Sequence, residues 1–246
     1  MRALIHAELL KLRTTRTVFG LLAAMLALVA AGVVATLLDA DDAMTSLPVA
    51  EQEFLGPILG SVATTFILVL GLRSFTDEFR YGSIVPTLLG TPHRGRVLAA
   101  KVVAVSAWSV VFAVSAYALA LAIGVPWLKA EGVNAAAQFG PLAALLGKIA
   151  LVSIWWAGLG VGVGLAARHQ VAAIVGSLLW VMIGESILIS LLPEVGKYLP
   201  SNATSAMIGG PGEELLGPAG GALILAAWSA AAIGAGAILM RRRDVA

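Results

Sequence analysis

Long apolar stretches alternate with short polar ones along the whole chain. A helix rises about 1.5 Å per residue, so roughly 20 apolar residues cross the ~30 Å hydrocarbon core of a bilayer. The stretches show little alternation of period two, which favours helices over the strands of a barrel. The pattern predicts six membrane-spanning helices, at Val18–Leu38, Leu55–Leu72, Val102–Val125, Leu142–Ala167, Val171–Leu192 and Ala219–Met240.

Basic residues gather on one side of these predicted spans. All Lys and Arg residues except Lys129, Lys148 and Lys197 lie before the first span, between the second and third, in the turn after the fourth, or in the tail. The connection after the first span carries acidic residues instead: Asp39, Asp41, Asp42, Glu51 and Glu53. Cytosolic connections of membrane proteins carry the excess of Lys and Arg. The pattern therefore predicts that both termini are cytosolic.

The composition agrees with a protein that lies almost wholly in the bilayer. The 246 residues are 59% hydrophobic and 12% charged, with a mean hydropathy of +0.95, whereas soluble domains carry about 25% charged residues. We expect one all-α transmembrane domain over residues 1–246, multi-pass and most simply in a bacterial plasma membrane. The pI of about 9.2 does not indicate nucleic acid, because the basic residues border apolar spans. Membrane lipid is the expected contact.

Several kinds of active site are excluded by the residues themselves. The chain has no Cys, and its three His residues lie far apart, so neither thiol chemistry nor a metal site is expected. It has no G-x-x-x-x-G-K-[ST] phosphate-binding loop, since the nearest match, Gly147-Lys148, is followed by apolar residues. No Ser in the spans has a nearby His to activate it. The sequence therefore predicts no catalytic residue, no cofactor and no enzyme.

The first 17 residues predict an amphipathic helix that lies along the inner face of the membrane. With a period of 3.6 residues, Leu4, Ile5 and Leu9 share one arc and the basic residues lie opposite. Glu8 falls within the apolar arc, where a purely lipid-facing helix would not place a carboxylate. We expect Glu8 to meet a basic partner, for example in the stretch 73–101. The alternative is a basic flank that only orients the first span.

The stretch 73–101 is the longest charged interval between two predicted spans. Gly82 is suited to end an extension of the second span, and Ser83 to cap a short helix, Ser83–Leu89. Thr91 is predicted to cap the helix that follows. The short helix would expose four apolar residues, a pattern typical of a docking surface: Ile84, Val85, Leu88 and Leu89. The alternative is a helix that dips into the lipid headgroups.

Glu185 lies inside the fifth predicted span, where burying an unpaired ionisable group costs several kcal/mol. Residues of this kind commonly line a substrate path or relay protons. The alternatives are a protonated carboxyl or local pairing near the outer side. Lys148 is a candidate partner, although its long side chain can also extend outward to water.

Glycines recur at every second position of the fourth span, from Gly158 to Gly164. Small residues at this spacing let helix backbones approach closely, so this span is predicted to pack on another helix of the same chain or of a second copy. The later connection 193–218 is punctuated by four prolines. It predicts short amphipathic pieces that either re-enter the membrane or form an ordered outer cap.

Together these residues resemble the membrane subunits of ATP-binding-cassette (ABC) exporters of the type-2 permease class. The resemblance covers the topology of essentially the whole chain. Its sharpest parts are Glu8, Lys11 and Arg13 near the N-terminus, and a series in the stretch 73–101: Glu78, Gly82, Ser83, Leu88, Leu89, Pro92, Arg94 and Lys101. Ser83 stands where the family usually has Thr, which keeps a capping hydroxyl. Softer matches are Arg168 and the run Tyr198-Leu199-Pro200.

The resemblance implies a six-helix permease that pairs with a second copy or a similar subunit, and with separate P-loop ATPase subunits. The ATPase, not this chain, would bind ATP and Mg²⁺, and its closure would move the membrane helices. Contact with it would fall to the N-terminal helix and the short helix. The residues expected to couple the ATPase to the spans are Glu8, Glu78, Gly82, Ser83, Ile84, Val85, Leu88, Leu89, Arg94 and Arg168.

The residues leave two other functions open. One is a stand-alone secondary transporter in which Glu185 carries the coupling proton, although the chain lacks the internal repeats common in such proteins. The other is a non-transporting membrane partner of a signalling complex. Drug, lipid, peptide and ion substrates all remain open for the exporter, because the spans offer few distinguishing polar groups.

Overall fold

The computed structural model describes residues 1–38, 58–91, 93–130, 139–167, 169–209 and 216–242, and these residues form helices and no strand. The acidic group predicted at residues 39–53 lies outside the described residues. Two of the helical segments are π-helical, Leu59–Ala63 and Trp180–Gly184. The α-helices are α1 (Arg2–Thr14), α2 (Arg16–Leu38), α5 (Thr64–Arg80), α6 (Ile84–Gly90), α7 (Arg94–Ala130), α8 (Phe139–Ala167), α9 (Gln170–Leu179), α10 (Glu185–Leu191), α11 (Pro193–Gly196), α12 (Pro200–Ile208) and α13 (Pro218–Arg242).

Six helical stretches are long and apolar enough to cross a membrane, as the sequence predicts. The second joins the first π-helical segment to α5, and the fifth joins α9, the second π-helical segment and α10. Two of these stretches are longer than their apolar parts. The second runs on to Arg80, in agreement with the extension predicted to end at Gly82, and the third begins at Arg94, before the apolar residues that start at Val102. Apolar content alone therefore does not mark where a helix stops.

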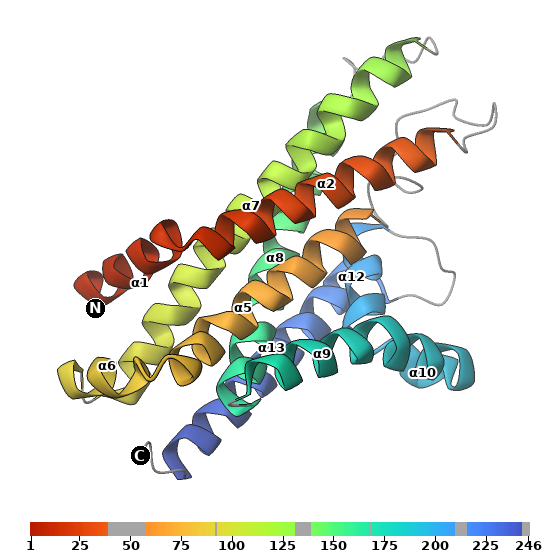
Figure 1. Cartoon of the computed structure of the whole chain (residues 1–246). Helices are drawn as coiled ribbons and strands as arrows, with labels where there is room; N and C mark the ends of the chain where they lie inside the picture. Colours follow the sequence, from red (N-terminus) through yellow and green to blue (C-terminus); the bar gives the residue numbers. More distant parts are fainter. Residues whose placement is uncertain (39–57, 92, 131–138, 168, 210–215, 243–246) are drawn as a thin grey trace.

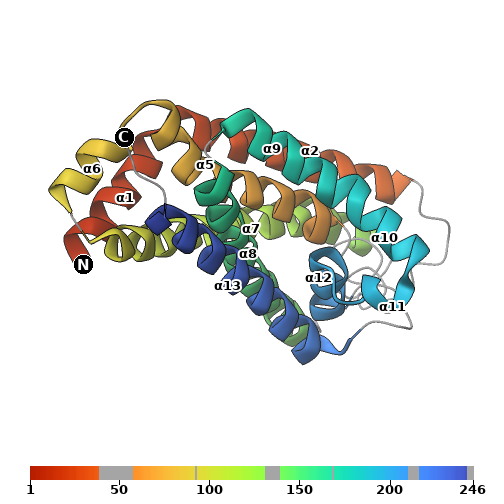
Figure 2. The same cartoon turned by 90° about the horizontal axis from the view of Figure 1, so that it is seen from below.

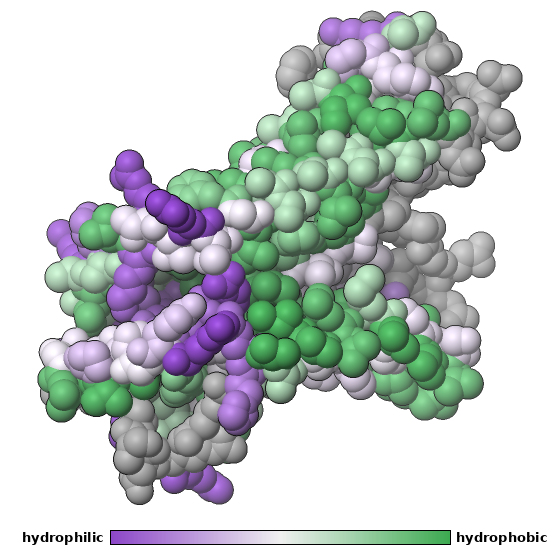
Figure 3. Space-filling model, viewed as in Figure 1, coloured by the Kyte–Doolittle hydropathy of each residue, from purple (hydrophilic) through white to green (hydrophobic). Residues whose placement is uncertain are grey.

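The N-terminus and the last turn of α13 lie at the same end of the helix bundle (Figure 1). We call this the terminal end; it holds α1, α6 and the last turn of α13. Figure 2 shows α11 and α12 at the opposite end. On the face drawn in Figure 3, strongly hydrophilic residues gather over the terminal end, with a smaller group at the far end of α7. Apolar residues cover the long helices between them, as a membrane-spanning surface requires.

Helix α8 packs between α5 and α13 through its glycines. A Cβ atom added at Gly160 or Gly164 would collide with the backbone of α5, at Leu68 or Leu72. A Cβ atom at Gly158 or Gly162 would collide with α13 instead. Residues two apart on a helix point to nearly opposite sides, so the alternating glycines serve two neighbours. The predicted close packing is therefore confirmed, and both partner helices belong to this chain.

The proline-punctuated connection forms two short helices that begin at prolines. Pro193 starts α11 and Pro200 starts α12, the position at which the missing proline N–H is of no consequence. Most of α12 is buried, because it packs against α13, α8 and the first π-helical segment. This segment therefore folds back into the bundle instead of lying over its end.

Candidate functional site

The stretch after the second span turns twice before the third span begins. Helix α5 ends at Arg80, and Gly82 follows with φ of +67°, a left-handed conformation that glycine adopts without strain. Helix α6 then runs to Gly90, and α7 starts at Arg94. The predicted helix end at Gly82 and the short helix are confirmed. Both lie at the terminal end, the end that also holds α1 (Figure 2).

Two predicted caps differ in the structure. The Ser83 side chain makes no capping hydrogen bond; instead its backbone carbonyl accepts bonds from the N–H and hydroxyl of Thr87, at 3.3 and 2.8 Å. Thr91 is not the N-cap of α7, because that helix begins at Arg94; Thr91 is instead the C-cap of α6, where its N–H donates to the Thr87 carbonyl at 3.1 Å. The carbonyl of His93 accepts the first bonds of α7, from Arg96 and Val97.

Helix α6 exposes part of the apolar surface predicted for it. Leu89 is 78% exposed and Val85 is also exposed, whereas Ile84 is only 4% exposed and belongs to the hydrophobic core. The expected exposure of Ile84 is therefore wrong, because the first turn of α6 faces the bundle. Tyr81, just before the turn, is exposed as well. The exposed apolar residues here are thus Tyr81, Val85 and Leu89, and we refer to these three as the predicted docking surface; the side chain of Leu88 lies outside the described residues.

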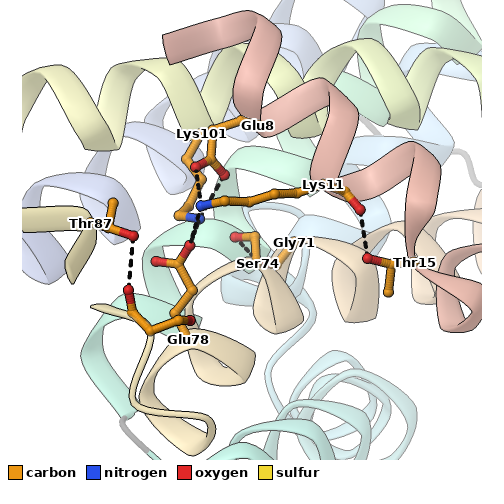
Figure 4. A network of polar contacts seen from close by, with 9 residues as sticks. Glu8, Lys11, Thr15, Gly71, Ser74, Glu78, Thr87 and Lys101 are labelled. Atoms are coloured by element: carbon orange, nitrogen blue, oxygen red, sulfur yellow. Dashed lines mark hydrogen bonds and ion pairs between the residues drawn. The ribbon is translucent and has the colours of Figure 1, made fainter. Parts of the chain in front are cut away.

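Four charged side chains meet near the terminal end and join three helices (Figure 4). From α1, Lys11 Nζ lies 2.7 Å from Glu8 Oε1 and 2.9 Å from Glu78 Oε1 on α5. From α7, Lys101 Nζ lies 2.8 Å from Glu8 Oε2 and 2.8 Å from Glu78 Oε1. The expectation that Glu8 meets a basic partner from the stretch 73–101 is confirmed, and the partner is Lys101. We call these four residues the charge network.

Most of the charge network is buried. Lys101 is 2% exposed, and both glutamates are also buried. Lys101 Nζ further lies 5.1 Å from the centre of the Phe75 ring, within range of a cation–π contact. Two acids and two bases balance in charge, which is the condition under which charges are tolerated away from water. Glu8, Glu78 and Lys101 therefore hold α1, α5 and α7 in one fixed arrangement.

The two members on α1 stay ionised. Burial alone would raise the pKa of Glu8, but the charges and hydrogen bonds of Lys101 and Lys11 outweigh it and hold that pKa below its usual value. Burial would lower the pKa of Lys11, and the bonds to Glu8 and Glu78 raise it overall. Both shifts favour the charged forms, so the contacts of α1 are ionic throughout the neutral range.

A cleft of about 190 Å³ opens beside the charge network. Its lining comes from α1, the start of α2, the last turns of α5 with the residues that follow them, and Lys101 and Val105 of α7. Glu78 borders it, and the second carboxylate oxygen of Glu78, Oε2, is buried with no hydrogen-bond partner among the described residues. The charge network thus borders the cleft and includes one acceptor without a partner.

A second polar cluster, which the sequence analysis missed, ties α5 to α9. Asp77 pairs with Arg73 at 2.9 Å and accepts a 2.6 Å hydrogen bond from the Gln170 side chain. Arg80 donates to the same Gln170 at 2.9 Å. The Arg73–Asp77 pair has the i, i+4 spacing that a sequence can reveal, but the bond to Gln170 depends on the fold. Arg168, predicted in the adjoining turn, lies outside the described residues.

Arg94, predicted to couple the ATPase to the spans, makes a hydrogen bond within this chain. Its guanidinium donates to the backbone carbonyl of Met240 at 2.6 Å. That carbonyl belongs to the last turn of α13, where cations offset the partial negative charge of the helix end. The predicted coupling residue therefore joins the start of α7 to the end of α13.

Glu185 lies far from the charge network, in the half of the bundle opposite the terminal end. Its side chain is 1% exposed, and Oε2 accepts a 2.9 Å hydrogen bond from the backbone N–H of Ser201. No hydrogen bond or ion pair joins it to Lys148 among the described residues. The structure thus places Glu185 against the first turn of α12 and leaves the proposed Lys148 pairing without support.

No protein-family model matches the chain, and no curated protein shows a significant match to it.

Proposed function

We propose that this chain is the permease subunit of an ABC exporter, in which a separate ATPase drives substrate across the membrane. The proposal rests on one observation above all: a buried, charge-balanced network links three helices at the same end of the bundle as α6, which exposes Val85 and Leu89. A transporter chain without a phosphate-binding loop cannot use ATP through such a loop. It needs a surface through which an ATPase partner can move its helices. The resemblance to type-2 permeases leads to the same proposal.

The arrangement suits the transmission of force from the terminal end. Helix α6 is connected to α5 and α7 by short turns, and the charge network fixes α1 to the same two helices. A push on α6 or α1 therefore reaches α5 and α7 together. Arg94 carries it to α13, and the Asp77 cluster carries it to α9.

The partner in this proposal is a P-loop ATPase that binds ATP and Mg²⁺ on the cytosolic side. Its contact would be Tyr81, Val85 and Leu89, an apolar patch beside the basic residues of α1. Small apolar patches bordered by charge are typical of protein-binding surfaces. A second copy of the chain, or a similar subunit, would complete the permease.

Purification of a tagged chain in mild detergent tests the proposal. We expect a P-loop ATPase in stoichiometric amount, and we expect Leu89→Asp to abolish its recovery because the substitution places a charge in the docking surface. Val195→Asp is the matched control, since Val195 is also an exposed aliphatic residue on a short helix, α11, at the opposite end. Both variants should insert into the membrane at the wild-type level.

The other outcomes of this experiment identify the competing functions. Recovery of the ATPase with Leu89→Asp at the wild-type level would show that α6 does not form the interface with the ATPase. Recovery of a kinase or another regulator would indicate a signalling partner. Substrate movement that depends on a proton gradient, with no ATPase recovered, would indicate a secondary transporter.

A further inference from the structure

The carboxylate of Glu185 is held on one side only. Oε2 bonds to Ser201, the second residue of the nine-residue helix α12, and the first turn of a helix favours negative charge. The other oxygen, Oε1, is buried and has no hydrogen-bond partner among the described residues. A fully buried acceptor without a partner is costly. A ligand group that donates a hydrogen bond or carries positive charge would supply the partner that this oxygen lacks.

A cavity of about 450 Å³ lies at Glu185, between α5, α8, α9, α12, α13 and the second π-helical segment. Its size is in the range of about 300–1,000 Å³ that is usual for small-molecule sites. The residues that line it are mostly apolar, and they include three tryptophans: Trp156, Trp180 and Trp228. The π-helical segment supplies Trp180 and ends immediately before Glu185, and such segments occur often at functional sites.

The lining selects for positive charge. Among the described residues that border the cavity, Glu185 is the charged one, and none is Lys, Arg or His. The indole N–H groups of Trp156 and Trp228 already donate, to Thr204 at 2.8 Å and to the Tyr198 carbonyl at 2.9 Å. Trp156 is 1% exposed, so the rings that a ligand can contact are those of Trp180 and Trp228, and the electron-rich face of such a ring attracts cations. A neutral ligand without a hydrogen-bond donor would leave Oε1 unpaired, and an anion would be repelled by the carboxylate.

We propose that the Glu185 cavity binds an apolar organic cation, a mainly hydrocarbon or aromatic molecule with one positive group directed at Oε1. As a statement about the exported substrate this rests on the proposed function, because binding alone does not show transport. The carboxylate gives the site its charge preference, and the tryptophans and aliphatic side chains accept the hydrocarbon. The site thus narrows the open list of substrates to one chemical class.

Binding of tetraphenylphosphonium to the purified chain in nanodiscs of neutral phospholipid tests the proposal. We expect saturable binding above that of empty nanodiscs, and none for tetraphenylborate, an anion of nearly the same size and shape. Glu185→Gln should weaken the binding of the cation about tenfold or more. Glu194→Gln is the matched control and should not change it, because the Glu194 side chain is 83% exposed and pairs with Lys197.

A second variant keeps the test decisive if Glu185→Gln fails to fold. Trp180 is partly exposed, so Trp180→Leu should fold and should weaken binding of tetraphenylphosphonium about threefold or more. Equal binding of the borate, or unchanged affinity in both cavity variants, would overturn the proposal. No ATPase is present in this assay, so its result is independent of the co-purification test. If no ATPase is recovered but the cation still binds, the exporter function is contradicted and the proposed cation site stands.

Discussion

Lys101 and Lys11 bind the same two carboxylates but differ in their access to water. Lys101 is 2% exposed, whereas the Lys11 side chain is 49% exposed. Water can replace much of what Lys11 contributes, as it does for most surface ion pairs. It cannot replace Lys101, whose removal would leave Glu8 and Glu78 buried with half of their positive partners. Lys101 therefore contributes more than Lys11 to the stability of the charge network.

We accordingly expect Lys101→Met to lower the free energy of unfolding by about 3–5 kcal/mol and Lys11→Met by about 1 kcal/mol or less. Titration of the purified chain with a denaturing detergent measures both. The double variant Lys101→Met with Glu78→Gln should recover part of the loss, because it removes a buried negative charge along with the positive one. Equal losses for the two single variants would contradict this assignment of weight.

At the scale of helices, α8 depends on residues that have no side chain. Its glycines bring the backbone of α8 against α5 on one side and α13 on the other. Contacts of this kind stabilise helix pairs in membranes through van der Waals packing. Adding one methyl group at such a contact forces the helices apart, which typically costs about 1–3 kcal/mol. The same methyl group on an open face of α8 meets nothing.

Gly160→Ala should therefore reduce the free energy of unfolding by about 1–3 kcal/mol. Gly147→Ala on the same helix should raise it by about 0.5–1 kcal/mol, because no atom lies near the added Cβ and alanine favours the helix. The detergent titration also measures this pair. A similar effect of the two substitutions would show that α8 does not pack through Gly160.

The elements that the sequence predicted best are those fixed by local chemistry. Apolar length gave the six long helices, and Gly82 gave the end of α5, because glycine alone adopts φ of +67° without strain. The buried side of α6 was missed, since seven residues are too few to establish which face a helix turns inward. Glu8 was expected to find a base, but the choice of Lys101 depends on how α1 lies against α7.

The Glu185 cavity shows the same limit. The sequence singled out Glu185 because a carboxylate inside an apolar stretch is unusual. It gave no reason to connect that residue with Ser201 or with Trp156 and Trp228 on other helices. Those neighbours are set by how α12 folds back into the bundle, which the proline pattern left undecided between two arrangements.

For the whole molecule, the distribution of Lys and Arg predicts that the terminal end faces the cytosol. The chain has no Cys, so single cysteines report orientation directly. Val195→Cys should react with a membrane-impermeant maleimide on intact cells. Arg2→Cys should react only after the cells are opened; both positions are exposed. Labelling of both positions from the same side would contradict the orientation.

The long helices differ in how firmly they join the molecule. Helices α5, α8 and α13 are in backbone contact through glycines. Helix α2 is buried along one stripe of residues only: Val18, Met25, Val29 and Val33. The span formed by α9, the second π-helical segment and α10 has only Ala173 and Glu185 buried among its described residues. A displacement at the terminal end would therefore move α5, α8 and α13 as one body, to which the Asp77 cluster holds the start of α9, while α2 is the span able to shift against it.

The charge network also bears on the order in which the protein is made. All four of its residues lie within the first 101 positions, and chains fold from the N-terminus as the ribosome releases them. The network can close once α7 has begun to form, before the last three long helices have been synthesised. Three early helices would then be locked in register while α8 is still to be inserted. The charges that fix the finished protein are thus suited to guide its biogenesis.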